Sequence, residues 1–381
     1  MRSTRAVVYK NNLIHNLSVI QSFIKDSNTK ICAAVKANGY GSGAVFAAKT
    51  ALASGASFCA VATVDEGIEL RESGIASPIL LLSLCTPDEM KDAVLYKLTP
   101  LVCDEAYAEL FNVAAGKYAS GKFSVHIAVD TGMRRIGCSV DEASRFAKRI
   151  VNLPHLVLGG VCTHFSSADE TDEVSRRYTD DQFSHFMHAV KSIEGEGIDP
   201  GIRHCAASAA LLDRPEMQLD MVRPGIAMYG YFDGSIDGAY CAERGKPCTL
   251  EPVMALESEV VAIKSIKKGE AVSYNRTWTA ECDTAVATLP IGYADGLPRS
   301  LSPGLCVAIN GKNYPVVGRI CMDQCMVDVG SSGVHRWDKA LIFGPENSGA
   351  LQTAADIAKA SGTISYEILT GIAKRVPRVE G

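Results

Sequence analysis

Residues 31–62 read ICAAVKANGYGSGAVFAAKTALASGASFCAVA, and they contain the repeating unit from which the fold of this chain can be predicted. The unit begins with an apolar, strand-like run at Ile31–Val35 and continues with an amphipathic, helix-length segment at Ala44–Ala53. A second strand-like run follows at Phe58–Ala62. A strand, a helix and a strand in this order predict two parallel strands joined by a crossover helix.

The same alternation continues through the first 240 residues. The further strand-like runs are Ile79–Leu84, Thr99–Cys103, Val125–Val129, Leu156–Cys162, Ile202–Cys205 and a short one at Met221–Val222. The stretches between them carry apolar residues at helical spacing, as in Asp65–Ser73, Pro87–Tyr96 and Asp141–Ile150. Eight such repeats over about 230 residues predict an α/β fold, a closed (β/α)8 TIM barrel. The alternative is an open doubly wound sheet, but no G-x-G-x-x-G sequence follows the first strand.

The last third of the chain changes character from about Thr249 onward. A long β-like run covers Val253–Ile266, and shorter ones follow between Gly, Pro and Asn residues, at Asp283–Leu289, Cys306–Ile309, Tyr314–Ile320, Cys325–Val329 and Ala340–Phe343. This pattern predicts a mostly β-strand C-terminal domain over 241–381, after a barrel domain over 1–240. The first few residues are a candidate for pairing with the C-terminal domain. We expect a linker at Asp233–Pro247 and a last helix at Ala354–Ala360.

Composition argues against several kinds of partner. The 38 Lys and Arg residues against 43 Asp and Glu give a formal net charge of −5, so no basic surplus is available for nucleic acid. The apolar stretch Pro78–Cys85 is far shorter than the roughly 20 residues that span a bilayer, and the N-terminus has no signal-peptide core. We therefore expect the 13 cysteines to be reduced thiols in the cytoplasm. The lone C-x3-C pair, Cys321 and Cys325, predicts no metal site.

A barrel fold also predicts where the active site lies, because such sites form at the C-terminal ends of the strands. The polar residues at these ends are Lys36, Thr63, Asp130, His164, Ser208 and Arg223. A lysine, a histidine and an arginine are thus expected at one mouth. Thr63 can equally cap the next helix, and Asp130-Thr-Gly can be an ordinary turn.

The lysine stands in Ala34–Gly41, at the end of a buried strand. An amine at the rim of an apolar barrel loses solvation, which disfavours its charge and makes it a nucleophile. The alternative is a lysine that extends its amine to solvent. Asn38-Gly39 allows a turn with positive φ, which we expect to bring Tyr40 over the lysine and to leave backbone amides free for an anion.

A second motif covers Met221–Gly230. Gly225 and Ile226 can present N–H groups at a helix start, where phosphate commonly binds after the last barrel strands, and Ser208 can add a hydroxyl. The alternative for Arg223 is an ion pair that only seals the barrel. His164 is equally compatible with a structural, hydrogen-bonded side chain. In the C-terminal part, Val272–Trp278, Tyr293–Gly296 and Gly318–Gln324 stand out, although the residues alone favour a surface tyrosine, a turn and a hairpin.

Taken together, these segments resemble the alanine racemase family of fold-type III pyridoxal-phosphate (PLP) enzymes over essentially the whole chain. The lysine motif, THFSSAD (163–169), VRPGIAMYG (222–230), GYADG (292–296) and GRICMDQ (318–324) occur in the family's order and at its spacing. The resemblance implies a cytoplasmic PLP enzyme that interconverts L-alanine and D-alanine and supplies D-alanine for peptidoglycan synthesis. It also implies a head-to-tail homodimer with active sites shared between subunits.

The resemblance assigns roles residue by residue. Lys36 matches the lysine that binds PLP and is one catalytic base, and Tyr274 matches the second base. The phosphate-binding positions are Tyr40, Ser208, Gly225, Ile226 and Tyr366. Arg223 matches the arginine at the pyridine nitrogen, held in place by His164. Arg135 and Met322 match contacts to the substrate carboxylate, and the access corridor is expected at Asp169, Tyr293, Arg299 and Arg319. Tyr274 and Met322 are implied to serve the other subunit's site.

Three positions depart from the family pattern. Ser42 stands where histidine is usual, Arg134 stands where glycine is common, and Ala128 replaces a carbamylated lysine that orients the substrate-binding arginine. Arg135 must then be held by a bound anion or another side chain, and a preference for serine or a broader set of amino acids stays open. The rivals are a decarboxylase of basic amino acids, which uses a carboxylate where Arg223 stands, and a PLP-carrier barrel, which lacks a second domain.

Overall fold

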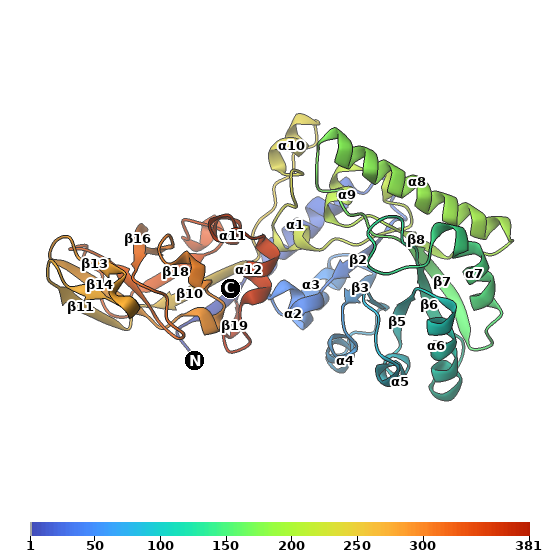
Figure 1. The fold of residues 1–381 in the computed structure, drawn as a ribbon, viewed down its shortest axis with the longest axis horizontal. Helices are drawn as coiled ribbons and strands as arrows, with labels where there is room; N and C mark the ends of the chain where they lie inside the picture. The colour runs from blue at the N-terminus through green and yellow to red at the C-terminus, as the bar shows by residue number, and fades with distance from the viewer. Residues whose placement is uncertain (1) are drawn as a thin grey trace.

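The first part of the chain is a barrel of parallel strands, seen on the right of Figure 1 in a computed structural model that describes residues 2–381. The strands pair in the order β8-β7-β6-β5-β4-β3-β2-β9, and every pair is parallel. Their bounds are β2 Lys30–Ala34, β3 Phe58–Val61, β4 Ile79–Leu81, β5 Leu98–Val102, β6 Phe123–Ala128, β7 Leu156–Cys162, β8 Ile202–His204 and β9 Met221–Val222. The gap between β8 and β9 is bridged by Asp220 N to Arg203 O at 3.2 Å and Arg223 N to Ala206 O at 2.9 Å. The barrel is therefore nearly closed, as predicted.

Helices cover the outside of the barrel (Figure 1). They are α1 Lys10–Phe23, α3 Ala44–Ala53, α4 Val64–Glu72, α5 Pro87–Leu95, α6 Glu105–Tyr118, α7 Ala143–Val151 and α8 Glu173–Gly195. The short elements α2 Lys36–Tyr40 and α9 Ser208–Asp213 begin at the mouth of the barrel. Thr63 begins α4 with a capping box: its hydroxyl accepts from Glu66 N, and the Glu66 side chain accepts from Thr63 N. Thr63 thus takes the capping role that was the alternative to a site residue.

Apolar side chains fill the barrel interior. One buried cluster takes a single residue from each of seven strands: Cys32, Ala60, Leu80, Leu101, Ala128, Cys162 and Met221. Inward residues of successive strands form such layers in TIM barrels. This layer closes the bottom of the cavity described below, because Leu101, Ala128 and Cys162 also line it.

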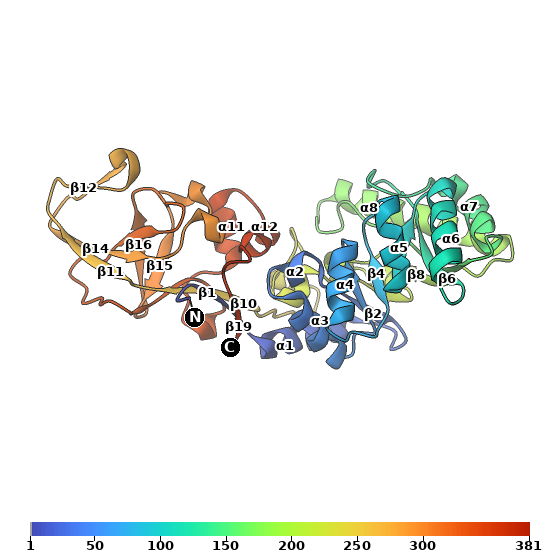
Figure 2. The same cartoon turned by 90° about the horizontal axis from the view of Figure 1, so that it is seen from below.

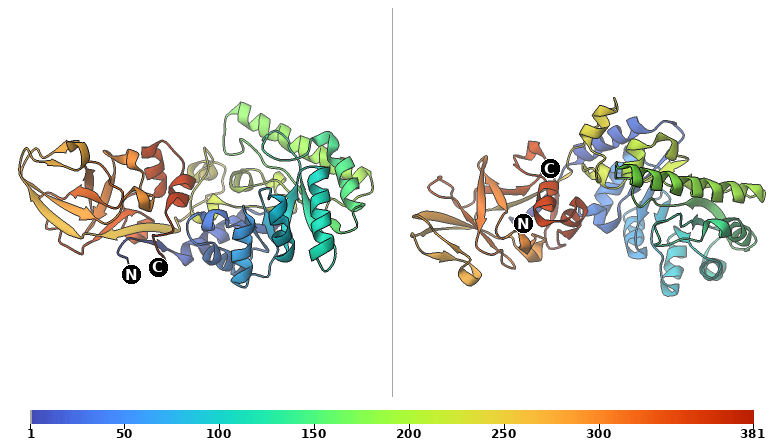
Figure 3. Two further views of the ribbon diagram at one scale, coloured as in Figure 1. Left: turned by 60° about the horizontal axis from the view of Figure 1, so that its bottom comes forward. Right: turned by 45° about the horizontal axis from the view of Figure 1, so that its top comes forward.

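A nine-stranded sheet forms the second part, which confirms the mostly β-strand expectation. Its order is β11-β14-β17-β16-β15-β18-β10-β1-β19. The bounds are β1 Arg5–Val8, β10 Met254–Glu259, β11 Ala262–Ile266, β14 Thr284–Leu289, β15 Cys306–Ile309, β16 Lys312–Val317, β17 Cys325–Asp328, β18 Lys339–Phe343 and β19 Arg378–Glu380. The N-terminal β1 lies between β10 and β19, so both chain ends lie at this sheet, near its junction with the barrel (Figure 3).

The structure differs from the sequence expectations in three places. The run Val253–Ile266 is two strands, because the chain changes partners at Val260 from β18 to β14. The expected linker contains a helix, α10 Gly238–Glu243, which Asp237 caps by accepting from Tyr240 N at 2.8 Å. After α11 Ala354–Ser361 comes a further helix, α12 Ser365–Gly371, which contacts α2. Because α12 carries Tyr366, this contact brings Tyr366 to the barrel mouth.

Candidate active site

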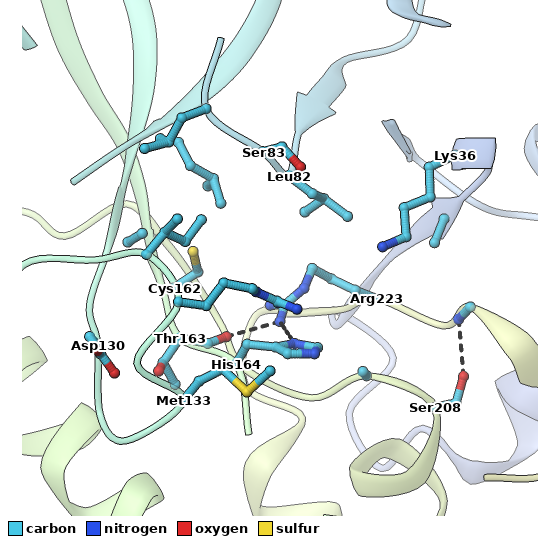
Figure 4. Close-up of a pocket in the computed structure, with 18 of the residues that line it drawn as sticks. Lys36, Leu82, Ser83, Asp130, Met133, Cys162, Thr163, His164, Ser208 and Arg223 are labelled. Carbon is cyan, nitrogen blue, oxygen red and sulfur yellow. Dashed lines mark hydrogen bonds between the residues drawn. The ribbon is translucent and has the colours of Figure 1, made fainter. Parts of the chain in front are cut away.

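A cavity of about 500 Å³ opens at the C-terminal mouth of the barrel (Figure 4). It is lined by eight of the residues predicted from the sequence: Lys36, Tyr40, Arg135, His164, Ser208, Arg223, Gly225 and Tyr366. Ile226, also predicted, is fully buried beside Gly225 and begins the short 3-10 helix Ile226–Tyr229. These residues come from the ends of β2, β6, β7, β8 and β9 and from α12, so the barrel topology brings together segments that are far apart in the sequence.

Lys36 extends its amine into this cavity toward Arg223 (Figure 4). The amine makes no hydrogen bond or ion pair with any residue in 2–381. Burial lowers the pKa of Lys36, and the charges of Arg135 and Arg223 lower it further, while Glu66 works in the opposite direction. The lysine is thus partly desolvated and unpartnered, as a nucleophile or base requires.

The turn after Lys36 is left-handed over four residues. Ala37, Asn38, Gly39 and Tyr40 have φ of 52°, 54°, 60° and 50°. The positive φ expected at Asn38-Gly39 is present, but two of the amides expected to be free for an anion are already bonded. Ala37 N donates to Glu66 Oε1 at 2.6 Å, and Gly39 N donates to Val35 O at 2.8 Å. These two bonds hold the left-handed backbone of the turn.

Arg223 follows β9 and is only 6% exposed. All its acceptors are neutral: Nη1 bonds His204 Nδ1 at 2.7 Å, and Nη2 bonds Thr163 O at 2.9 Å, Cys205 O at 3.3 Å and His164 Nδ1 at 3.3 Å. No carboxylate of the described chain pairs with it, so the interpretation as a sealing ion pair is wrong. One N–H of Nη1 and the Nε–H keep no acceptor within 2–381 and remain available to a ligand.

Two further histidines support Arg223, and no sequence motif had indicated either of them. His204, on β8, bonds through Nε2 to His126 Nδ1, on β6, at 2.9 Å, and both side chains are buried. Because an arginine can only donate, His204 Nδ1 accepts and its Nε2 carries the proton given to His126. Burial and the charge of Arg223 lower the pKa of His126 to about 4 and that of His204 well below its usual value. Burial, with Arg223 and Arg135, also lowers the pKa of His164 to about 3. The Arg223 guanidinium is therefore held by hydrogen bonds to neutral imidazole rings.

The other end of the cavity carries hydroxyl groups and a glycine. Ser208 Oγ, at the start of α9, accepts from Gly225 N at 3.0 Å and Ala227 N at 3.3 Å. A Cβ at Gly225 would lie 2.5 Å from the Tyr40 hydroxyl, so only glycine leaves this space open. Below Tyr40, the ring of Tyr229 stacks at 4.6 Å, and its hydroxyl donates to Ala34 O at 3.0 Å. Tyr229 fixes the ring of Tyr40, a role that its motif did not reveal.

Arg135 lines the cavity without a partner among the described residues, and the buried methyl group of Ala128 lies in the layer below. The neighbouring Asp130 is occupied by its own turn, because Oδ1 accepts from Gly132 N at 2.9 Å and Arg134 N at 3.0 Å. Its other oxygen lies 3.7 Å from Arg134 Nη1. The interpretation of Asp130-Thr-Gly as a turn therefore accounts for this carboxylate.

The three C-terminal motifs meet one another but not the cavity. Ser273 Oγ donates to Arg319 O at 2.8 Å, and Tyr293 N donates to Cys321 O at 3.0 Å. Tyr274 and Met322 are 69% and 52% exposed, and neither lines the barrel cavity. Tyr274 lies between β12 Ala271–Val272 and β13 Trp278–Thr279, at the end of the sheet farthest from the barrel (Figures 1 and 2).

The remaining corridor positions are spread out. Asp169 borders a small second cavity with His164. Arg299 begins the 3-10 helix Arg299–Leu301, and Arg319 Nε is buried without a partner in the described chain. No helix of 2–381 is long and apolar enough to cross a membrane, and over the same range no group of three His, Cys, Asp or Glu side chains could hold a metal ion.

Comparison with known proteins places this geometry in a family. Residues 8–233 match the family model described as alanine racemase, N-terminal domain, and residues 253–380 match alanine racemase, C-terminal domain. Alanine racemase of Treponema denticola is 48% identical over 382 residues, covering 100% of this chain and 98% of its own. The structure of alanine racemase from Clostridium difficile 630 superposes with a TM-score of 0.91 at 36% identity, covering 100% of this chain and 96% of that one. The Bacillus anthracis enzyme with bound L-Ala-P gives 0.90 at 36% identity, with coverage of 100% and 95%.

Proposed function

The chain belongs to the alanine racemase family, and from this premise we propose that it is a PLP-dependent racemase that interconverts L-alanine and D-alanine. The observation that carries the proposal is the pairing, in one cavity, of the unpartnered Lys36 amine with a buried Arg223 that has only neutral acceptors. The metabolic role that we infer is the supply of D-alanine for peptidoglycan synthesis.

The side chains of the cavity fit PLP. The Lys36 amine would bind its aldehyde carbon, and the free N–H groups of Arg223 would meet its pyridine nitrogen. Gly225 leaves space beside the hydroxyls of Ser208 and Tyr40, where the phosphate would lie. When bound, PLP withdraws electrons from the substrate Cα and acidifies its proton.

Arg223 selects among the reactions open to such a cofactor. A guanidinium does not give up its proton near neutral pH, so a pyridine nitrogen bound beside Arg223 would stay unprotonated. The neutral His204 and His164 hold the arginine in place without adding a carboxylate that could take part in proton transfer. With PLP bound, this arrangement would limit the spread of negative charge into the ring and would favour return of the proton to Cα, and hence racemisation over transamination.

Lys36 serves as the base on one face of the substrate. Its lowered pKa, caused first by burial and then by Arg135, increases the fraction of neutral amine that can accept the Cα proton. Arg135 is exposed at the cavity mouth without a partner in residues 2–381, so its charge is available to the substrate carboxylate.

The second base, on the opposite face, is Tyr274 of a partner subunit. Within one chain Tyr274 is far from the cavity and largely exposed, as is Met322. Racemisation needs proton exchange on both faces of the same carbon. We therefore propose a head-to-tail homodimer in which each C-terminal part presents Tyr274 and Met322 to the neighbour's barrel.

Subunit complementation tests this arrangement. Lys36→Ala and Tyr274→Phe are each expected to abolish racemisation while leaving the fold intact, because neither the Lys36 amine nor the Tyr274 hydroxyl makes a hydrogen bond or ion pair within residues 2–381. Mixed and re-associated subunits contain heterodimers in which one site has both native bases. Random pairing of two-fold symmetric subunits then restores about a quarter of the wild-type activity. A mixture that stays inactive although heterodimers form would refute the shared site.

A second experiment measures the substrate preference of the wild-type enzyme. Each enantiomer of alanine and of serine is incubated with the enzyme in D2O, and inversion and α-deuterium are followed together. Two bases predict inversion with deuterium incorporation from either alanine enantiomer, and Lys36→Ala is expected to lose the visible absorbance of lysine-bound PLP. Exchange without inversion would exclude a two-base racemase.

A further inference from the structure

The hydroxyl-rich end of the cavity also contains a carboxylate, Asp233. Its Oδ2 accepts a hydrogen bond of 2.5 Å from the Tyr366 hydroxyl. Asp233 and Tyr366 line the same cavity as Ser208 and Gly225, and the Tyr366 ring lies 5.7 Å from that of Tyr40. An ionised carboxylate among groups suited to a phosphate is a conflict, because like charges repel most strongly where water is displaced.

Asp233 is fixed in this position by its turn. Asp233 and Ile236 form an isolated antiparallel bridge, and Ser235 N donates to Asp169 O at 2.8 Å. A Cβ at Gly234, which has φ of 53°, would lie 2.5 Å from the same Asp169 oxygen, so the turn packs closely against the loop after β7. These contacts hold the backbone at Asp233, and the hydrogen bond from the Tyr366 hydroxyl holds its carboxylate at the cavity.

We propose, building on the function proposed above, that Asp233 is a positioning residue that couples binding of the cofactor's phosphate to the uptake of one proton. The Tyr366 hydroxyl has a single proton to donate. When Asp233 is ionised, it accepts the hydrogen bond of the Tyr366 hydroxyl, and the carboxylate charge repels the phosphate. When Asp233 takes a proton from solvent, its own O–H donates to the Tyr366 oxygen, and Tyr366 donates to the phosphate.

The surroundings of Asp233 favour the protonated form. Burial raises the pKa of Asp233, the Tyr366 hydrogen bond opposes that rise, and the nearby charge of Asp169 adds to it. The titratable groups that face it are Tyr366 from α12, Tyr40 from α2, and His164 and Asp169 from the loop after β7. As pH rises through the pKa of Asp233 the carboxylate ionises, so affinity for a phosphorylated ligand falls.

Ligand binding to the full-length enzyme, stripped of PLP, tests the proposal. The probes are PLP, pyridoxine phosphate, which lacks the aldehyde, and pyridoxal, which lacks the phosphate, each titrated from mildly acidic to mildly alkaline pH. Asp233→Asn replaces the acid by an amide that cannot ionise but still donates to the Tyr366 oxygen. At mildly alkaline pH we expect it to bind both phosphorylated probes about tenfold more tightly than wild type, with a flatter pH dependence and no change for pyridoxal.

Matched variants separate this role from a structural one. Asp237→Asn makes the same chemical change four residues away at the cap of α10, outside the cavity, and is expected to leave all three affinities unchanged. Asp233→Asn introduced into Tyr366→Phe is expected to have a smaller effect, because the relay through the phenol is missing and only the charge repulsion is relieved. Asp233→Ala, a second variant, removes both the charge and the donor to the Tyr366 oxygen, and it is also expected to lose the pH dependence and to bind the phosphorylated probes more tightly than wild type at mildly alkaline pH.

Two results would overturn the inference: an Asp233→Asn affinity for the phosphorylated probes that follows the wild-type pH profile, or an equal change for pyridoxal. The visible absorbance of the wild-type protein distinguishes failure of the proposed function from failure of this inference. If neither PLP nor pyridoxal gives the visible absorbance of a lysine adduct, the assignment of Lys36 fails. If that absorbance forms and Asp233→Asn has no effect, only the role of Asp233 fails.

Discussion

Replacing His204 by phenylalanine tests whether the two-histidine support holds Arg223. The ring nitrogens of His204 accept from Arg223 Nη1 at 2.7 Å and bond His126 Nδ1 at 2.9 Å, and all three side chains are buried. Phenylalanine keeps the ring but removes both bonds. Loss of a hydrogen bond to a charged donor and of a second, neutral one is expected to lower the free energy of unfolding by about 3 kcal/mol.

Urea denaturation of the PLP-loaded protein measures this loss. His204→Gln keeps an acceptor and a donor and is expected to recover part of it. His185→Phe, on the exposed face of α8, is the control for the chemical change and is expected to stay within about 0.5 kcal/mol of wild type. A His204→Phe loss below about 1 kcal/mol would mean that Arg223 is held by its carbonyl contacts alone, and the support role would be abandoned.

Two more predictions follow from the same network. Lowering the pH should destabilise the protein, because burial lowers the pKa of His126 to about 4 and keeps this histidine neutral when folded. An unfolded histidine binds a proton below about pH 6.5. The contribution of His126 to the free energy of unfolding is therefore complete above that pH and falls by about 3 kcal/mol toward pH 4. Urea titrations across this range check the slope, which His126→Phe should flatten. Gly160→Ala should lower the free energy of unfolding by about 2 kcal/mol, because the new Cβ would lie 2.6 Å from Ile202 O and 2.7 Å from His126 Cε1. Gly121→Ala is the control: its new Cβ would have no atom within 4 Å, so it should be neutral in the same assay. An equal effect of the two glycine changes would show that the space around His126 is not the cause.

Local patterns in the sequence were sufficient for the barrel and for most of its mouth. Strand and helix periodicity is a property of neighbouring residues, and the rule that strand ends of a barrel converge then places Lys36, Ser208 and Arg223 together. The sequence pattern did not predict the short helix α12, because its seven residues are too few for a helical period to stand out beside the longer α11. The break in Val253–Ile266 was not predicted either, because both halves are equally strand-like and only the change of pairing partner separates them.

The residue types at the strand ends and the order of the motifs were thus determined by the sequence, including the resemblance to the racemases. The tertiary structure decided which groups touch: His126 and His204 are 78 positions apart, and Asp233 and Tyr366 are 133 apart. It also decided that Tyr274 is remote from Lys36 within one chain. Hydrogen bonds across such separations depend on how whole elements pack, and burial, which sets the charge states of these side chains, exists only once the chain has folded.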